Sequence, residues 1–183
     1  AFLGGQPQCV FEAHSTDAQP ADGLKALVRD HFAILKVGPG ATFALRESLW
    51  GLAAIEQALP GGEHVPDLRK RVVAVMRADT QHWRGHYHGE GEALDFDLQY
   101  SLSDRIRYYW PYPDVQRAVA AMLERLDRRP IPLALLSQFL PRQYEAVREG
   151  RIAATPGALL REGVAASLRP YIAACAGPSK AAA

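Results

Sequence analysis

CVFEA at residues 9–13 and FAILKV at residues 32–37 are the two stretches that decide the fold. Each is a short apolar run with β-branched or aromatic residues, which predicts a β-strand. Between them Leu24, Leu27 and Val28 recur at helical spacing, so the unit is expected to be strand, helix, strand. A crossover of this kind joins parallel strands, and we therefore expect an α/β fold.

The remainder of the chain is predicted to be almost entirely helical. Thr42 stands at an N-cap position after the glycine-proline loop that ends the second strand. Apolar residues then recur at helical spacing in several segments, separated by prolines and glycines. We expect helices at 42–59, 66–82, 92–110, 113–126, 132–150 with a break at Pro141, and 156–174.

Two parallel strands are too few for an independent sheet, because their apolar character demands cover on both faces. Either further strands come from a partner, or the chain is the C-terminal part of a larger domain. A complete (β/α)₈ barrel needs about 250 residues, so this chain supplies at most its last two units. We assign residues 1–62 to those βα units, 63–176 to an all-helical C-terminal extension and 177–183 to a disordered tail.

Composition narrows the classes of function. The chain has 183 residues and a net charge of +1, so we expect neither nucleic acid nor an anionic membrane as a partner. Its two cysteines, Cys9 and Cys175, exclude a disulfide framework and multi-cysteine metal sites, and they suit a reducing cytoplasm. No apolar run approaches the roughly 20 residues that cross a bilayer, and the N-terminal residues do not have the pattern of a targeting segment.

Glu12, His14 and Asp17 follow one another at the end of the first strand. Alternate side chains of a strand share a face, so Glu12 and His14 point the same way. Imidazole with carboxylates suits acid-base catalysis or a divalent metal such as zinc, with His14 as a candidate ligand. The alternative is structural: Glu12 and His14 hydrogen-bond to each other while Asp17 caps a turn.

The second strand ends in Lys36, followed by Gly38, Gly40 and Thr42. A lysine, close backbone amides and a helix start together predict a seat for phosphate or another part of a substrate. Lys36 is a candidate catalytic residue. Its amine could form a Schiff base with a substrate or a salt bridge with Glu12, and the sequence does not decide between these two roles. No phosphate-loop pattern occurs in the chain, so a kinase is disfavoured.

The histidines at 82 and 86 have the spacing of a helical metal pair, but Trp83 stands where a zinc protease has glutamate, and we expect a helix C-terminus there. Arg105 and Arg107 lie in a polar and aromatic cluster. Being two residues apart, they cannot share one helical face. We expect one to reach a ligand or phosphate and the other a surface carboxylate. Alternatively, the cluster is an aromatic anchor, with residues 108–110 and 112 as exposed contacts.

Five stretches of the chain resemble the non-catalytic subunit family of class II D-tagatose-1,6-bisphosphate aldolases. They are FEAHSTD at 11–17, DHFAILKVGP at 30–39, TFALRE at 42–47, SDRIRYYWP at 103–111 and LLSQFLP at 135–141. The resemblance covers nearly all of this chain, but only the C-terminal part of a family member. At two positions the chain departs from what we expect of relatives, which is a larger residue such as alanine or leucine in place of Gly40 and commonly an aromatic one in place of Ala18.

The resemblance implies an aldolase-type TIM barrel, of which the two strands are the last two. It also implies an accessory subunit that supports a separate catalytic class II aldolase subunit in galactitol, N-acetylgalactosamine or tagatose catabolism, with a sugar phosphate as ligand and an oligomer as the working form. A metal-dependent ketose or ketose-phosphate 4-epimerase is the alternative. Whether the chain is itself an enzyme stays open at this point.

Overall fold

The computed structural model describes residues 8–61 and 64–176. Two compact units are distinguished, residues 1–41 with 165–183, and residues 42–164. The segment 177–183, predicted to be a disordered tail, lies outside the described residues. Within the described ranges no helix is both long and apolar enough to span a bilayer.

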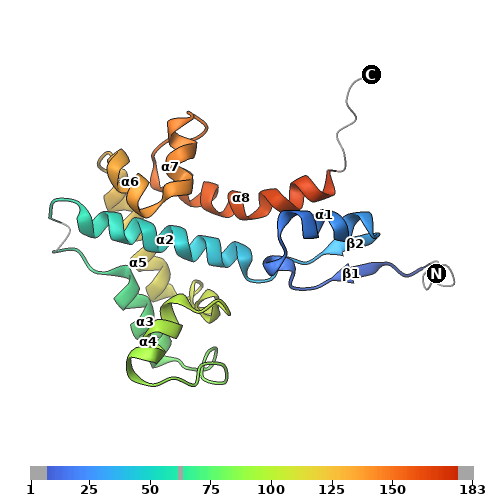
Figure 1. Cartoon of the computed structure of the whole chain (residues 1–183). Helices are drawn as coiled ribbons and strands as arrows, with labels where there is room; N and C mark the ends of the chain where they lie inside the picture. Colours follow the sequence, from blue (N-terminus) through green and yellow to red (C-terminus); the bar gives the residue numbers. More distant parts are fainter. Residues whose placement is uncertain (1–7, 62–63, 177–183) are drawn as a thin grey trace. The chain divides into compact units, whose positions relative to one another are not determined.

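The first unit contains the predicted strand, helix, strand. Strand β1 (Phe11–Ala13) is followed by a 3₁₀ turn, η2 (Thr16–Ala18), and by helix α1 (Ala21–Arg29), and strand β2 (Phe32–Leu35) then pairs with β1 in parallel (Figure 1). This strand, helix, strand unit with its parallel pair agrees with the predicted α/β class. His31, in a left-handed conformation with φ of 68°, makes the sharp turn from α1 into β2.

The two-stranded sheet is only partly covered by the described residues. Leu24 of α1 is buried, but Phe11 and Ile34 are 37% and 43% exposed. The last helix, α8 (Pro156–Cys175), ends in this unit, and the hydroxyls of Thr16 and Tyr171 hydrogen-bond at 3.0 Å. Strands in parallel sheets are normally buried on both faces, so the exposed apolar side chains mark a sheet that requires further cover.

The second unit is a helical bundle in which α2 (Gly40–Ala58) is the most buried helix. Its other helices surround the same core, and Figure 1 shows them on several sides of α2. They are α3 (Leu68–Ala78), α4 (Gly91–Tyr100), the 3₁₀ helix η4 (Arg105–Tyr109), α5 (Pro113–Asp127), α6 (Leu133–Phe139), α7 (Pro141–Arg148) and the first part of α8.

Two predicted helix boundaries are wrong. Helix α2 begins at Gly40, so Thr42 lies inside its first turn and is not the N-cap. The single helix expected at 92–110 is interrupted after Tyr100, and Asp104 adopts a left-handed conformation with φ of 51° before η4 begins. Ser101, the C-cap of α4, already has a non-helical backbone with φ of −54° and ψ of 137°, so the α-helix ends there, and the left-handed Asp104 stands at the start of η4.

Close packing fixes α2 against the hairpin of α6 and α7. A Cβ atom at Gly51 would lie 2.4 Å from Leu140 Cδ2 and 2.8 Å from the carbonyl oxygen of Phe139. The buried side chain of Gln143 donates to Ser48 Oγ at 3.1 Å from the same side. Gly51 is therefore required for the close approach of the two backbones.

A buried ion pair holds the segment between α4 and η4 against α2. Arg46 Nη1 lies 3.1 Å from Asp104 Oδ1, and the side chains are 3% and 0% exposed. Thr42 Oγ1 donates to the other carboxylate oxygen at 2.8 Å, and Arg46 Nη1 also donates to the carbonyl of Ser101 at 3.0 Å. Burial raises the pKa of Asp104 and lowers that of Arg46, while their mutual attraction opposes both shifts.

We predict that Arg46→Met lowers the free energy of unfolding by about 3–5 kcal/mol, because Asp104 is left buried without its counter-charge. Urea unfolding measures the change. In the double variant Arg46→Met/Asp104→Asn the loss is smaller than in the single variant, because no charge is stranded and Asn tolerates the left-handed conformation.

The matched control is Arg71→Met, which removes one of the two arginine partners of Asp114, from a pair whose side chains are 55% and 46% exposed. Its expected cost is about 0–1 kcal/mol. A double variant that is less stable than Arg46→Met would contradict the role assigned to the buried pair.

Candidate functional site

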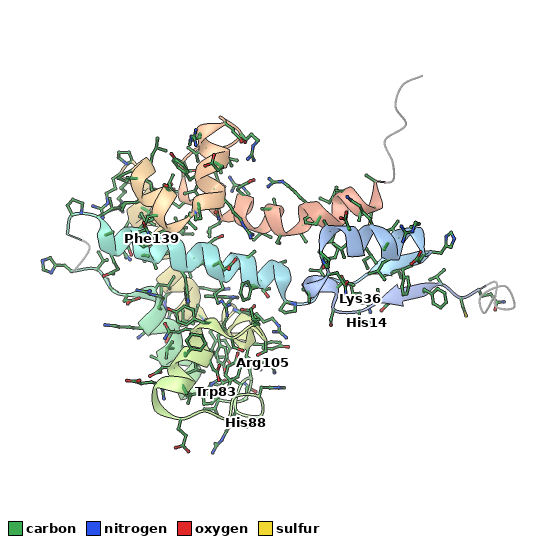
Figure 2. The ribbon with its side chains drawn as sticks, in the orientation of Figure 1. His14, Lys36, Trp83, His88, Arg105 and Phe139 are labelled. Atoms are coloured by element: carbon green, nitrogen blue, oxygen red, sulfur yellow. The ribbon has the colours of Figure 1, made fainter. Side chains whose placement is uncertain are left out.

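Three predicted site residues meet at the carboxyl end of the two strands. His14 Nε2 lies 2.5 Å from Glu12 Oε1, and Lys36 Nζ is paired with the same carboxylate oxygen. Strand alternation places Glu12 and His14 on one face, and the parallel register brings Lys36 beside them from the neighbouring strand. Figure 2 shows His14 and Lys36 in this region. The Lys36–Glu12 salt bridge, one of the two alternatives left open for Lys36, is present.

The carboxylate of Glu12 is the centre of this cluster. Its hydrogen bond to Lys36 lowers the pKa of Glu12 below the usual value, with a further contribution from His14. The His14 and Lys36 side chains are 68% and 51% exposed. One carboxylate therefore binds two nitrogen groups that remain accessible to solvent.

Asp17 is bound to the glycine loop that follows β2. The backbone amides of Gly38 and Gly40 donate to its two carboxylate oxygens at 2.7 and 2.8 Å. A Cβ atom at Gly38 would lie only 2.2 Å from Asp17 Oδ2 and one at Gly40 2.5 Å from Oδ1. The amides predicted to hold phosphate thus already bind an anionic group of the chain itself, which is the turn-capping alternative for Asp17.

Thr42, Arg105 and Arg107 belong to the second unit. Thr42 donates to the buried Asp104 carboxylate. Arg105 Nε donates to the carbonyl oxygen of His82 at 2.6 Å, and Arg107 Nη1 donates to that of Ser103 at 2.6 Å. No described residue forms the surface carboxylate pair expected for one of the two arginines.

Both arginines nevertheless lie over one side chain of η4, that of Tyr108. Their guanidinium carbons lie 4.8 and 4.4 Å from the centroid of the Tyr108 ring, and the imidazole of His82 stacks on that ring at 5.1 Å. Cations favour the face of an aromatic ring. The arrangement is a half-buried cationic and aromatic cluster that contains both predicted ligand-binding arginines.

His82 and His86 do not form the helical metal pair considered above. Helix α3 ends at Ala78, and both histidines lie in the irregular segment that follows it. Trp83 in that segment donates to the buried carbonyl of Met76 at 2.6 Å. Within residues 8–61 and 64–176 no three His, Cys, Asp or Glu side chains are gathered as a metal-ligand group.

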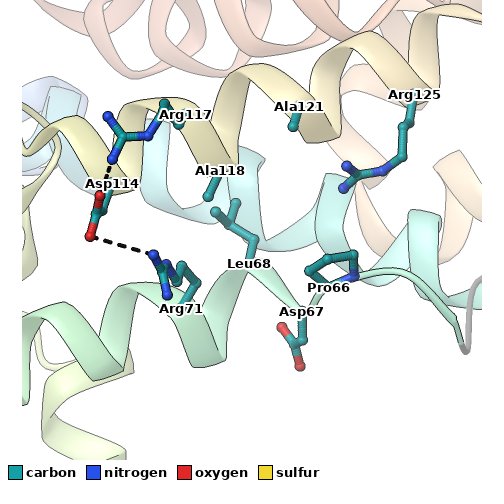
Figure 3. A pocket seen from close by; sticks show the side chains of 9 residues that line it. All are labelled: Pro66, Asp67, Leu68, Arg71, Asp114, Arg117, Ala118, Ala121 and Arg125. Atoms are coloured by element: carbon teal, nitrogen blue, oxygen red, sulfur yellow. Dashed lines mark hydrogen bonds and ion pairs between the residues drawn. The ribbon is translucent and has the colours of Figure 1, made fainter.

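A cavity of about 390 Å³ lies between α3 and α5 (Figure 3). Leu68 contributes to its apolar lining, while Asp114 binds both Arg71, at 3.4 Å, and Arg117. Arg125, also in its wall, is held by the buried Glu56 with Nε at 2.7 Å from Oε1. Because these arginines are engaged by carboxylates, the cavity offers no free cationic group among them.

Sequence reasoning missed the pairing of Arg46 with Asp104 and that of Arg125 with Glu56. The available signal was a charged residue in an otherwise apolar helical stripe: Arg46 lies next to Leu45, and Glu56 next to Ile55. A buried charge requires a partner. The sequence does not say which residue of the distant α5 or η4 segments supplies it.

Two comparisons with known proteins identify relatives. A family model described as D-tagatose-1,6-bisphosphate aldolase subunit GatZ/KbaZ-like matches residues 1–176. A solved structure described as a probable tagatose 6 phosphate kinase from Sinorhizobium meliloti 1021 is 47% identical, with a TM-score of 0.89 over 94% of this chain. This chain spans only 45% of the length of that protein.

The match to the family model confirms the resemblance stated from the five stretches, since all five lie inside residues 1–176. By this match, which covers more than half of its length, the chain belongs to the family of GatZ/KbaZ-like subunits of D-tagatose-1,6-bisphosphate aldolase.

Proposed function

We propose that residues 1–62 are the last two βα units of an aldolase-type TIM barrel and that residues 63–176 are its helical extension. The partly exposed apolar side chains of β1 and β2 support this assignment, because further strands of a barrel would cover them. The solved relative is more than twice as long as the matched region, which is compatible with a larger domain.

We propose that the protein acts as an accessory, non-catalytic subunit that increases the activity and stability of a catalytic class II aldolase subunit in tagatose-related catabolism. The observation that carries this proposal is the mutual pairing at the strand ends. Glu12 is bound by His14 and Lys36, and Asp17 by two backbone amides. Groups held in this way stabilise one another and the sheet.

The pairing argues against a catalytic lysine in particular. A Schiff-base lysine requires a free amine next to its substrate, whereas the Lys36 amine is bound to a carboxylate. A kinase is also disfavoured, because the chain contains no phosphate-loop pattern. The kinase description belongs to the solved relative and has no counterpart in the residues described for this chain.

A metal-dependent ketose or ketose-phosphate 4-epimerase is the second candidate, favoured by the exposed imidazole of His14 beside Glu12. These residues offer two donors, and a catalytic metal usually takes three from the protein. The described residues therefore do not complete a metal site. Gly38, Gly40, Thr42, Arg105 and Arg107 remain proposed contacts for a sugar phosphate, although the two amides are occupied by Asp17.

The accessory role predicts that the intact protein alone does not turn over tagatose 1,6-bisphosphate, while its addition increases the activity of the catalytic aldolase subunit and its half-life on heating. Coupled assays with each subunit alone and with the mixture measure both effects. Glu12→Gln/His14→Ala is expected to leave this stimulation unchanged, because neither side chain reacts. Metal-dependent turnover of a ketohexose phosphate by the intact protein, lost in this variant, would establish the epimerase instead.

Replacing Lys36 by Met is predicted to raise the pKa of Glu12 toward the ordinary glutamate value of about 4.3, because the largest cause of its lowered pKa is removed. Because its pKa is lowered in the folded state, Glu12 stabilises the fold at pH values above the ordinary glutamate pKa. This stabilisation is lost as the pH falls through the folded-state pKa. A carboxyl carbon NMR titration measures the shift.

Lys25→Met is the control for the titration, since Lys25 pairs with Asp22 in an exposed contact on α1. It should leave the Glu12 titration as it is. An unchanged Glu12 titration in Lys36→Met would show that a group other than Lys36 lowers the pKa of Glu12.

The barrel assignment predicts that Ile34→Asp destabilises the intact protein by about 3 kcal/mol or more, because a charge would be placed in a covered strand. Ile172→Asp, at a helical position that is 66% exposed, is expected to change stability by no more than about 0.5 kcal/mol. Urea unfolding compares the two. Equal and small effects would mean that no further strands cover the sheet.

A further inference from the structure

A second cavity lies within the helical unit, between α2, the hairpin of α6 and α7, and the first part of α8. Its volume is about 210 Å³, which at about 30 Å³ for each water molecule is room for about seven. We call it the α2–α7 cavity. Its lining combines an apolar wall, which includes Phe139, with a polar wall formed by Glu47, Ser48, Arg142 and Gln143. The volume is on the scale of one small molecule such as a single sugar ring.

Gln143 brings a buried amide to the α2–α7 cavity, with only 5% of the residue exposed. Ser48 Oγ donates its hydrogen to the carbonyl oxygen of Ala44 at 2.8 Å, so it accepts from Gln143 Nε2, at 3.1 Å. This arrangement fixes the orientation of the amide. It leaves Gln143 Oε1 and the second N–H of Nε2 without a partner among the described residues. Because buried polar groups are normally hydrogen-bonded, the amide has an acceptor and a donor left for a molecule in the cavity.

Gly163 allows α8 to pass close to this amide. A Cβ atom at Gly163 would overlap with Ser48 Oγ and would lie 2.8 Å from Gln143 Nε2. Glycine in a helix interior is about 1 kcal/mol less favourable than alanine, and here it leaves the room that the Ser48–Gln143 hydrogen bond needs. The amide is thus held in one orientation before a ligand arrives, which reduces the entropy that binding costs.

Two charged side chains of the lining have no partner. Neither the Glu47 carboxylate nor the Arg142 guanidinium makes a hydrogen bond or ion pair with another residue of 8–61 and 64–176, and both residues are exposed. The charge of Glu47 acts on the buried Arg46, whereas Glu162, on the α8 side, is bound by Arg151 at 3.2 Å. The lining therefore offers one available carboxylate and one available guanidinium, whose charges cancel.

This combination favours a neutral molecule with several hydroxyl groups. An anion attracted by Arg142 would be repelled by Glu47, and a cation would meet the reverse. Ion pairs with exposed side chains also contribute little, so the neutral, buried amide of Gln143 is the more selective group. A hydroxyl donates to a carboxylate or amide oxygen and accepts from a guanidinium or amide N–H. Neighbouring hydroxyls would therefore reproduce the hydrogen bonds of the water that they displace from a polar cavity.

The apolar wall suits the carbon-hydrogen face of a sugar. Phe139 of α6 (Figure 2) is 37% exposed and lines the cavity opposite no other aromatic residue of the lining. Ligand pockets typically combine such apolar and aromatic surface with a few placed polar groups. We infer that the α2–α7 cavity binds one neutral sugar or polyol, with Gln143, Glu47 and Arg142 as its hydrogen-bonding groups. This site is separate from the cluster at the strand ends and does not depend on the accessory function.

Binding is measured on the intact protein by ¹H–¹⁵N NMR, which observes the side-chain amide of Gln143 directly. The probes are D-tagatose, D-galactose and galactitol, which represent a ketose, an aldose and an open-chain polyol. At least one of them is expected to shift the Gln143 side-chain signals and to saturate at about 10 mM or less. Absence of such a saturable shift with all three would overturn the inference. L-Serine tests a zwitterion, and saturation by serine but by no sugar or polyol would assign the cavity to amino acids instead.

A double variant tests the groups that line the cavity. Glu47→Gln/Arg142→Met is expected to weaken binding of the sugar or polyol at least about tenfold, because two charge-assisted hydrogen bonds are lost. The matched control is Glu145→Gln/Arg148→Met, which alters the same residue types at exposed positions of α7 outside the cavity and should bind like the unmodified protein.

Thermal unfolding verifies that both double variants retain the fold. Equal affinities of the unmodified protein and the cavity variant would place the ligand elsewhere and overturn the inference. No aldolase subunit takes part in these measurements, so their failure would leave the accessory function untouched.

Discussion

A pair of parallel strands has two faces to bury, and one crossover helix cannot bury both. This constraint governs the first unit. Helix α1 packs its Leu24 inward, yet Phe11 and Ile34 remain in contact with solvent. The same parallel arrangement brings the carboxyl ends of both strands to one edge, where Glu12, His14 and Lys36 meet. The incomplete cover and the polar cluster thus have a common origin in the topology.

Local signals were sufficient for most elements of the fold. Short apolar runs predicted β1 and β2, and proline positions predicted the division between α6 and α7 at Pro141. The prediction failed where a conformation depends on distant residues. Nothing local identifies Asp104 as left-handed, because that conformation is maintained by Thr42 and Arg46 from α2.

The candidate site was predictable in its composition but only partly in its pairing. Strand alternation placed Glu12 beside His14, and the parallel crossover placed Lys36 beside both. The partner of Asp17 was ambiguous, because a carboxylate near a glycine loop can bind a metal, act on a substrate or accept from amides. Its hydrogen bonds to Gly38 and Gly40 show the last of these. The helical extension was less predictable, since Arg105 is oriented by the carbonyl group of His82, far away in sequence.

The Asp17 carboxylate also competes with any ligand for the backbone amides of the glycine loop. It belongs to the same folded unit and is held against the amides it occupies, so its effective concentration there is far above that of a metabolite in solution. An external anion exchanges one set of amide hydrogen bonds for an equivalent set and gains nothing from them alone. Only a molecule with additional contacts elsewhere would displace the internal carboxylate, which makes the loop selective against small inorganic anions.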